Sequence, residues 1–126
     1  MKTVKDFKDF DFENCSNVPE KYWGDYTCAN YYKGEFIPVV RKELKKMAKN
    51  IEAELKFSPN YFEWSAFFKK DGKFIYVHSS DARYWKWYND ILYRTAESEI
   101  DYTGGANRYC SFDKLEESLE ELFRWM

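Results

Sequence analysis

Two apolar-rich segments joined by a tight turn limit the folds open to this chain. In residues 61–70, one side of a strand would carry Phe62, Trp64, Ala66 and Phe68, and the other would carry Glu63, Ser65, Phe67 and Lys69; residues 73–80 return with a second apolar run. Between them, Asp71-Gly72 is a strong β-hairpin signal, because both residues tolerate the positive φ angles that a two-residue turn requires. The sequence therefore predicts two antiparallel strands joined by a turn at residues 70–73.

A long amphipathic segment precedes the hairpin. Residues 36–57 place apolar side chains every three or four positions, with Lys, Glu and Arg between them. This spacing puts the apolar residues on one side of an α-helix and the charged residues on the other. The apolar stripe consists of Ile37, Val40, Leu44, Met47, Ile51 and Leu55. Pro38 fits the first helical turn, and Ser58-Pro59-Asn60 is expected to end the helix.

A second amphipathic helix is predicted at the end of the chain. Ser111 is a candidate N-cap for residues 112–126, because its hydroxyl can accept a hydrogen bond from a free backbone N–H of the first turn. The apolar stripe of this helix consists of Phe112, Leu115, Leu119, Leu122 and Phe123. Both helices can then bury their stripes against one face of a sheet.

The segment between the hairpin and the last helix is ambiguous. Trp85, Tyr88 and Leu92 have helical spacing, whereas residues 91–96 resemble a strand. We favour an irregular turn followed by a third strand, with an optional short edge strand near Arg108. The predicted class is α+β: an antiparallel sheet of three to four strands with two helices packed on one face, in the order α-β-β-β-α. The residues expected to share its core are Leu44, Ile51, Trp64, Phe68, Leu115, Leu119 and Leu122.

Residues 1–35 lack a regular period but are rich in aromatic side chains. Disordered segments contain few aromatics, so we expect an ordered N-terminal arm of turns and short helical pieces, packed on the domain by its rings. A chain of 126 residues has the usual size of one domain. The predicted organisation is a single domain, 1–126, with the arm at 1–35 and the α-β-β-β-α core at 36–126.

The three cysteines predict neither a disulfide nor a zinc site. Cys15, Cys28 and Cys110 are odd in number and lack the paired spacing of metal ligands. The N-terminal residues contain no apolar run of signal-peptide length, and no segment has the length of a membrane span. We therefore expect three reduced thiols in a cytoplasmic protein that contacts no membrane.

The formal net charge of −2 restricts the class of partner. Overall attraction to a phosphate backbone requires an excess of cations, so nucleic-acid binding by net charge is disfavoured. The charge is also too small for a DNA mimic. A basic patch on one part of the surface is still compatible with this net charge.

His78 and Gly104-Gly105 could indicate catalysis or anion binding. His78 could form a proton-transfer site with Asp81 and its neighbouring serines, but a single histidine on a strand is usually structural. The two glycines could cradle a phosphate, but they lack the Lys-Ser/Thr of a P-loop and fit a turn that needs positive φ. A small anionic contact near Arg108 stays open. We therefore expect a protein that has no enzymatic activity and binds no cofactor or metal.

Residues 83–110 combine three of the chain's five arginines with seven large aromatic rings. Tyr, Trp and Arg are enriched at binding hot spots, and rings beside guanidinium groups also stack nucleobases. The candidate partner-binding residues are Arg83, Trp85, Trp87, Arg94, Tyr102, Arg108 and Tyr109. We expect them on one edge of the sheet, with Arg83, Trp87, Arg94 and Arg108 at least partly exposed.

An internal network is the alternative interpretation of the same arginines. In it they pair with nearby carboxylates and pack across the rings instead of waiting for a partner. The available carboxylates are Asp81, Asp90, Glu97, Glu99 and Asp101. Both interpretations stay open at this point.

Residues 68–123 contain a strand followed by Ser-Ser-Asp-Ala-Arg at 79–83, the run WYNDILYRTA at 87–96, Asp-Tyr-Thr-Gly-Gly at 101–105, and a closing acidic helix. In these features they resemble a short module found in proteins of phages and conjugative elements. Small proteins of such elements are often similar to anti-CRISPR or other counter-defence inhibitors. The resemblance implies binding to a host effector protein or ribonucleoprotein, such as a nuclease or its guide-RNA complex. A small RNA- or single-stranded-DNA-binding domain that uses the same rings is the alternative.

Overall fold

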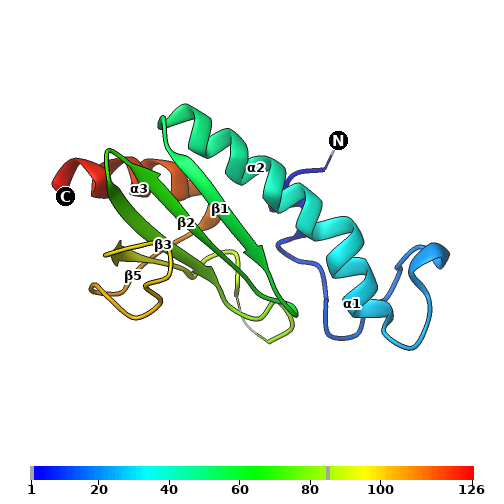
Figure 1. The fold of residues 1–126 in the computed structure, drawn as a ribbon. Coiled ribbons are helices and arrows are strands. Elements are labelled where there is room, and N and C mark those ends of the chain that lie inside the picture. Colours follow the sequence, from blue (N-terminus) through cyan, green and yellow to red (C-terminus); the bar gives the residue numbers. More distant parts are fainter. Residues whose placement is uncertain (1, 85) are drawn as a thin grey trace.

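The computed structural model describes residues 2–84 and 86–126, and its centre is an antiparallel sheet (Figure 1). Five strands follow one another in the order β1-β2-β3-β4-β5, each paired with the next along the chain. The strands are β1 (Glu54–Pro59), β2 (Trp64–Lys70), β3 (Lys73–Ser79), β4 (Ile91–Ala96) and β5 (Arg108–Cys110). The α+β class is therefore as predicted, with five strands in place of three to four.

Two helices cover one face of this sheet. Helix α2 (Ile37–Asn50) contacts β1, and helix α3 (Leu115–Trp125) contacts β3 and β4. The inward residues of both helices belong to one hydrophobic core with alternate residues of β2 and β3, and the seven residues predicted to share a core all belong to it. None of the helices among the described residues is long and apolar enough to cross a bilayer.

The hairpin between β2 and β3 is confirmed. Lys70 pairs with Lys73, and the two residues between them, Asp71 and Gly72, have φ angles of 51° and 75°. Positive φ at both central positions is the geometry of a type I′ turn, whose twist matches that of the flanking strands. The local sequence chemistry is therefore enough to set this turn.

The prediction that the first long helix reaches residue 57 is wrong. Helix α2 ends at Asn50, and Glu52 has a φ of 58°, which turns the chain out of the helix. Leu55, predicted to lie on the helical stripe, pairs with Phe68 as part of β1. Leu55 follows Ile51 by four residues, which fits a helix, but it also alternates with Phe57, which fits a strand. Periodicity alone therefore could not assign Leu55 to a helix or to a strand.

The helical backbone also begins earlier than predicted. Helix α1 (Thr27–Tyr31) runs into a π-helical turn, η3 (Tyr32–Phe36), and then directly into α2. Figure 1 shows these pieces as one continuous rod beside the sheet. The part of the chain expected as an irregular arm therefore supplies the first turns of the main helix.

The rest of the N-terminal segment packs through its rings. It contains two short 3₁₀ helices, η1 (Val4–Phe7) and η2 (Glu20–Tyr22). Phe7 and Phe12 are buried in the same core as α2 and α3, with ring centroids 5.1 and 5.2 Å from that of Phe36. Each buried aromatic ring removes a large apolar area from water, so these contacts hold the segment against the helix.

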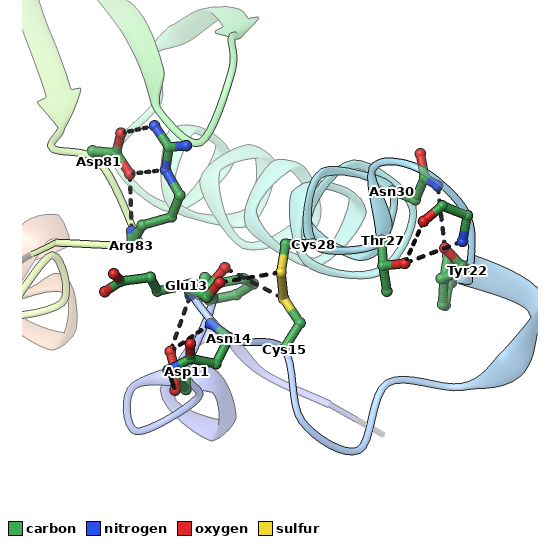
Figure 2. Close-up of a disulfide and its surroundings, with 12 residues drawn as sticks. Asp11, Glu13, Asn14, Cys15, Tyr22, Thr27, Cys28, Asn30, Asp81 and Arg83 are labelled. Atoms are coloured by element: carbon green, nitrogen blue, oxygen red, sulfur yellow. Dashed lines mark hydrogen bonds and ion pairs between the residues drawn. A yellow bond between two sulfur atoms is a disulfide. The ribbon is translucent and has the colours of Figure 1, made fainter.

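A disulfide joins Cys15 to Cys28, which corrects the expectation of three reduced thiols (Figure 2). Their Cα atoms lie 5.5 Å apart, an ordinary separation for a disulfide. Among the described residues, Cys110 is the free cysteine. Disulfides persist mainly in oxidising compartments, so the cytoplasmic location stays a prediction.

The last two elements follow the sequence closely. Strand β4 spans residues 91–96 as predicted, after turns at residues 82–84 and 87–89. A 3₁₀ turn, η4 (Phe112–Lys114), leads into α3. Ser111 stands at the N-cap position, but its hydroxyl donates to the Asp113 carboxylate and makes no capping bond to a backbone N–H.

Leu119 is fully buried in the core on α3, so Leu119→Ala should lower the free energy of unfolding by about 2–5 kcal/mol. The loss combines buried apolar area with the cavity left behind. Denaturant unfolding checks the value, with Glu117→Ala, an exposed position on the same helix, as the matched control. Wild-type unfolding of Leu119→Ala would remove α3 from the core.

Replacing both Cys15 and Cys28 by Ser should lower the free energy of unfolding by about 2–4 kcal/mol, because a crosslink over a sequence separation of 13 restricts the unfolded chain. Reductant should destabilise the wild type and leave the double variant unchanged. A thiol titration in denaturant without reductant should find one thiol per chain. Three reactive thiols would contradict the disulfide.

Candidate functional site

The seven predicted partner-binding residues do not share one edge of the sheet. Arg83 lies in the β3–β4 connection, and Arg94 and Tyr109 point to the face without helices, by their register with Tyr76 and Leu92. Arg108 pairs with Tyr93 and points to the helix-covered side. Trp85 lies outside the described residues. The single surface expected from the sequence is therefore divided.

Trp87 is a core residue, and the expectation that it is exposed is wrong. Only 3% of its surface is accessible. Its ring lies 4.9 Å from that of Phe36 and 6.5 Å from that of Phe12, centroid to centroid. An indole in this position stabilises the β3–β4 connection and offers nothing to a partner.

The face of the sheet opposite the helices carries a second aromatic cluster. Phe67 and Tyr76 are cross-strand neighbours whose ring centroids are 5.1 Å apart, and both are buried. Tyr102 covers them, at 5.4 and 5.7 Å from the two rings. Lys56 on β1 also donates to the Glu99 carbonyl, so the β4–β5 connection crosses over the sheet.

Arg94 belongs to this covered cluster. Its guanidinium lies 4.8 Å from the Tyr76 ring centroid and donates to the Asn107 side chain at 3.0 Å and to the backbone carbonyl of Tyr102. The residue is half-buried. These bonds agree with the internal-network interpretation for Arg94, because its donors already hold the β4–β5 connection in place.

The Gly-Gly loop binds an anion of the chain itself. The Asp101 carboxylate accepts hydrogen bonds from the backbone N–H groups of Glu97, Thr103 and Gly104, at 2.9, 3.2 and 2.8 Å. These bonds lower the pKa of Asp101. A Cβ on Gly104 would lie 2.3 Å from this carboxylate. The phosphate that a glycine-rich loop could cradle is therefore replaced here by Asp101.

His78 is held by residues other than those of the hydrolase alternative. Its Nε2 lies 3.4 Å from a Glu63 carboxylate oxygen, and its Nδ1 lies 3.5 Å from the Tyr76 hydroxyl. Asp81, the predicted orienting carboxylate, binds Arg83 instead. Within residues 2–84 and 86–126, no group of three potential metal ligands comes together.

Arg83 forms the most organised cluster on the surface, here called the Arg83 clamp: Asp81, Arg83, Tyr61, Phe62 and Tyr84. Asp81 accepts the Arg83 Nε at 3.0 Å, its Nη2 at 2.7 Å and its backbone N–H at 2.9 Å (Figure 2). The guanidinium carbon lies 5.2, 4.3 and 4.8 Å from the ring centroids of Tyr61, Phe62 and Tyr84. Ion pairing and stacking thus fix one orientation of the guanidinium.

The charges of the clamp reinforce each other. Burial raises the pKa of Asp81, but hydrogen bonds and the positive charge of Arg83 outweigh burial, so that the pKa lies below its usual value. The hydrogen bond to Asp81 in turn raises the pKa of Arg83. Both groups are ionised across the physiological range, and the pair is half-exposed.

A groove of about 430 Å³ adjoins the clamp and was missed by sequence reasoning. It lies between the helical residues 29–41 and the β1–β2 turn. Its lining residues are Ala29, Asn30, Tyr32, Lys33, Ile37, Pro38, Arg41, Pro59, Asn60, Tyr61 and Phe62. Tyr61 and Phe62 belong to both the groove and the clamp. Because these residues come from separate segments, the sequence signal was limited to two cations, Lys33 and Arg41, beside apolar helix positions.

Comparison with protein families, curated proteins and solved structures finds no match to this chain.

Substitution of Gly105 by Ala tests how closely the β4–β5 connection packs on the sheet, and substitution of Gly72 in the β2–β3 turn is the control. Gly105 has a φ of 79°, and a Cβ there would lie 2.4 Å from the Thr95 carbonyl oxygen, whereas one on Gly72, at 75°, would meet open space. Gly72→Ala should cost about 1–2 kcal/mol from backbone strain alone. Gly105→Ala should cost more, measured by denaturant unfolding. Equal losses would mean that residues 97–107 do not pack on the sheet.

Proposed function

We propose that this chain is a small interaction protein that binds a host effector protein or ribonucleoprotein through the Arg83 clamp. The resemblance of residues 68–123 to modules of mobile elements supports a counter-defence role, in which the chain inhibits a nuclease or its guide-RNA complex. The inhibitor acts by occupying a surface of its target, so that its own chemistry is limited to binding.

The observation that carries this proposal is the arrangement of Tyr61, Arg83 and Tyr84. Two exposed tyrosine rings flank a guanidinium that Asp81 holds in place. Tyr and Arg are the residues most often found at binding hot spots, and a side chain already fixed in its bound orientation loses little entropy when a partner arrives. Arg83 is also the last residue of the Ser-Ser-Asp-Ala-Arg motif on which the resemblance depends, and Tyr84 follows it directly.

The predicted alternative, nucleic-acid binding by the rings of residues 83–109, has less support. Trp87 is in the core, and Tyr102 lies over Phe67 and Tyr76 on the opposite face of the sheet from the helices. These rings do not form one stacking platform. The clamp is compact enough for a protein hot spot, whereas a strand of bases needs a longer row.

Tyr84→Ala should weaken partner binding by about 1–3 kcal/mol and leave the fold intact, because 62% of this side chain's surface is exposed. Tyr109→Ala is the matched control, since Tyr109 is 58% exposed on β5, away from the clamp. Arg83→Ala should instead lower the melting temperature, because it leaves the Asp81 carboxylate without its partner.

The assay measures inhibition of purified CRISPR effector complexes by the chain, with DNA cleavage as the readout. In separate arms the chain is added before or after the effector protein is loaded with its guide RNA. Wild-type inhibition that Tyr84→Ala reduces and Tyr109→Ala retains supports the proposal. Full inhibition by Tyr84→Ala would exclude the clamp as the binding surface. No inhibition across the effector classes would reject the counter-defence role.

A further inference from the structure

The solvent face of α2 is a continuous basic surface. The exposed cations of this helix are Arg41, Lys42, Lys45, Lys46 and Lys49. At about 100° per residue, they fall on one side of the helix, and Arg41, Lys45 and Lys49 form a row with about 6 Å between neighbours. The one carboxylate of α2, Glu43, is half-buried and accepts the backbone N–H of Val4. The row of Arg41, Lys45 and Lys49 therefore contains cations alone.

The groove lies at the N-terminal end of this basic surface, and Arg41 connects the two. Arg41 lines the groove, and its guanidinium lies 5.2 Å from the Phe57 ring centroid. Lys33 supplies a second cation at the groove. Tyr61 forms an exposed wall over Phe62, which is buried, with their rings edge to face at 4.8 Å. The volume is within the usual range of ligand pockets.

We propose that α2 and the groove bind single-stranded nucleic acid, with phosphates along the basic row and one base in the groove against Tyr61. Single strands are bound by the combination seen here, a cationic track with an aromatic side chain on which an unpaired base can stack. Asn30 and Asn60 line the same groove. The Asn30 amide nitrogen donates to the Tyr22 carbonyl and the Asn60 oxygen accepts the Tyr61 N–H, so the Asn30 oxygen can accept from a base edge and the Asn60 amide nitrogen can donate to one. A duplex keeps its bases stacked and cannot place one in the groove.

An acidic protein surface is the competing occupant, and α3 of a second copy is one example. Glu117, Glu120 and Glu121 lie on its exposed side, next to Trp125. However, Glu120 already pairs with Arg124 at 3.3 Å, and Arg124 would itself approach the cations of α2. A phosphate backbone carries no such opposing charge, so the basic row favours nucleic acid.

This inference does not rest on the proposed function, because it concerns a different surface that shares only Tyr61 and the buried Phe62 with the clamp. The test uses the purified chain and three fluorescein-labelled probes: a 12-nucleotide oligo(rU), a 12-nucleotide oligo(dT) and a 12-base-pair duplex. Fluorescence anisotropy is measured from low to physiological salt. Both single strands should bind more tightly than the duplex, and log K should fall with log salt at a slope of about −3 if about four phosphates are neutralised.

Charge reversal identifies the surface. Arg41→Glu/Lys45→Glu/Lys49→Glu should weaken single-strand binding at least tenfold and flatten the salt dependence. The matched control is Lys21→Glu/Lys69→Glu/Lys114→Glu, which changes net charge equally at exposed positions outside α2 and should bind as the wild type does. If the first variant fails to fold, Lys45→Glu/Lys49→Glu gives the same comparison.

Ring removal identifies the groove. Tyr61→Ala should weaken single-strand binding by about five- to a hundredfold, as expected for loss of one stacked base. Tyr109→Ala and Tyr84→Ala should leave it unchanged. Loss of partner inhibition by Tyr84→Ala with intact oligonucleotide binding would show that the two surfaces act independently.

The inference is overturned by any of four results. These are no binding of either single strand at low salt, equal affinity for the duplex, unchanged binding by the α2 charge reversal, and equally effective competition by polyglutamate. Sedimentation of the protein alone checks the remaining occupant: a dimer that the α2 charge reversal dissociates would assign this surface to a second copy of the chain.

Discussion

Burial of aromatic rings on one side of the sheet is the constraint on which the other features depend. Phe12, Phe36 and Trp87 come from the N-terminal segment, the helical rod and the β3–β4 connection, and their rings meet in one core. Trp87 thereby anchors the connection, while the Ala82 N–H donates to the Phe62 carbonyl at 2.9 Å. With both ends of this segment fixed, the Arg83 side chain lies over Phe62. The core therefore determines where the clamp stands.

On the opposite face of the sheet, a loop rather than a helix covers the aromatic rings. Tyr102 lies on the Phe67–Tyr76 pair, Arg94 binds the Tyr102 carbonyl, and Asp101 closes the turn around it. The sequence suggested Arg94, Tyr102 and Gly104-Gly105 as parts of a binding surface. In the structure they instead hold the β4–β5 connection against this face of the sheet. The clamp and the outer side of α2 are not part of this cover, and their side chains stay accessible to partners.

Local chemistry predicted the parts of the fold that are determined locally. Asp71-Gly72 sets its turn through φ, and the 3.6-residue period placed Leu44 and Leu119 in the core. Strand β1 was missed because Leu55 satisfies both the helical and the strand period, and nothing in the identity of Glu52 signals a positive φ. The pairing of Cys15 with Cys28 was missed because it depends on a contact between distant segments that spacing does not encode.

The candidate surfaces were harder to predict because net charge conceals how the charges are arranged. The net charge of −2 counts all 20 cations and 22 carboxylates of the chain, so the cations of α2 and the glutamates of α3 offset each other in it although they lie on different helices. The helices meet where Asn50 donates to Glu116, whereas Arg41 lies nine residues away, about 13 Å along the helix axis. At physiological salt, charges are screened beyond about 8 Å, so a strand at Arg41 experiences the local cations more than the distant carboxylates. A chain with net negative charge can therefore present a surface suited to a polyanion.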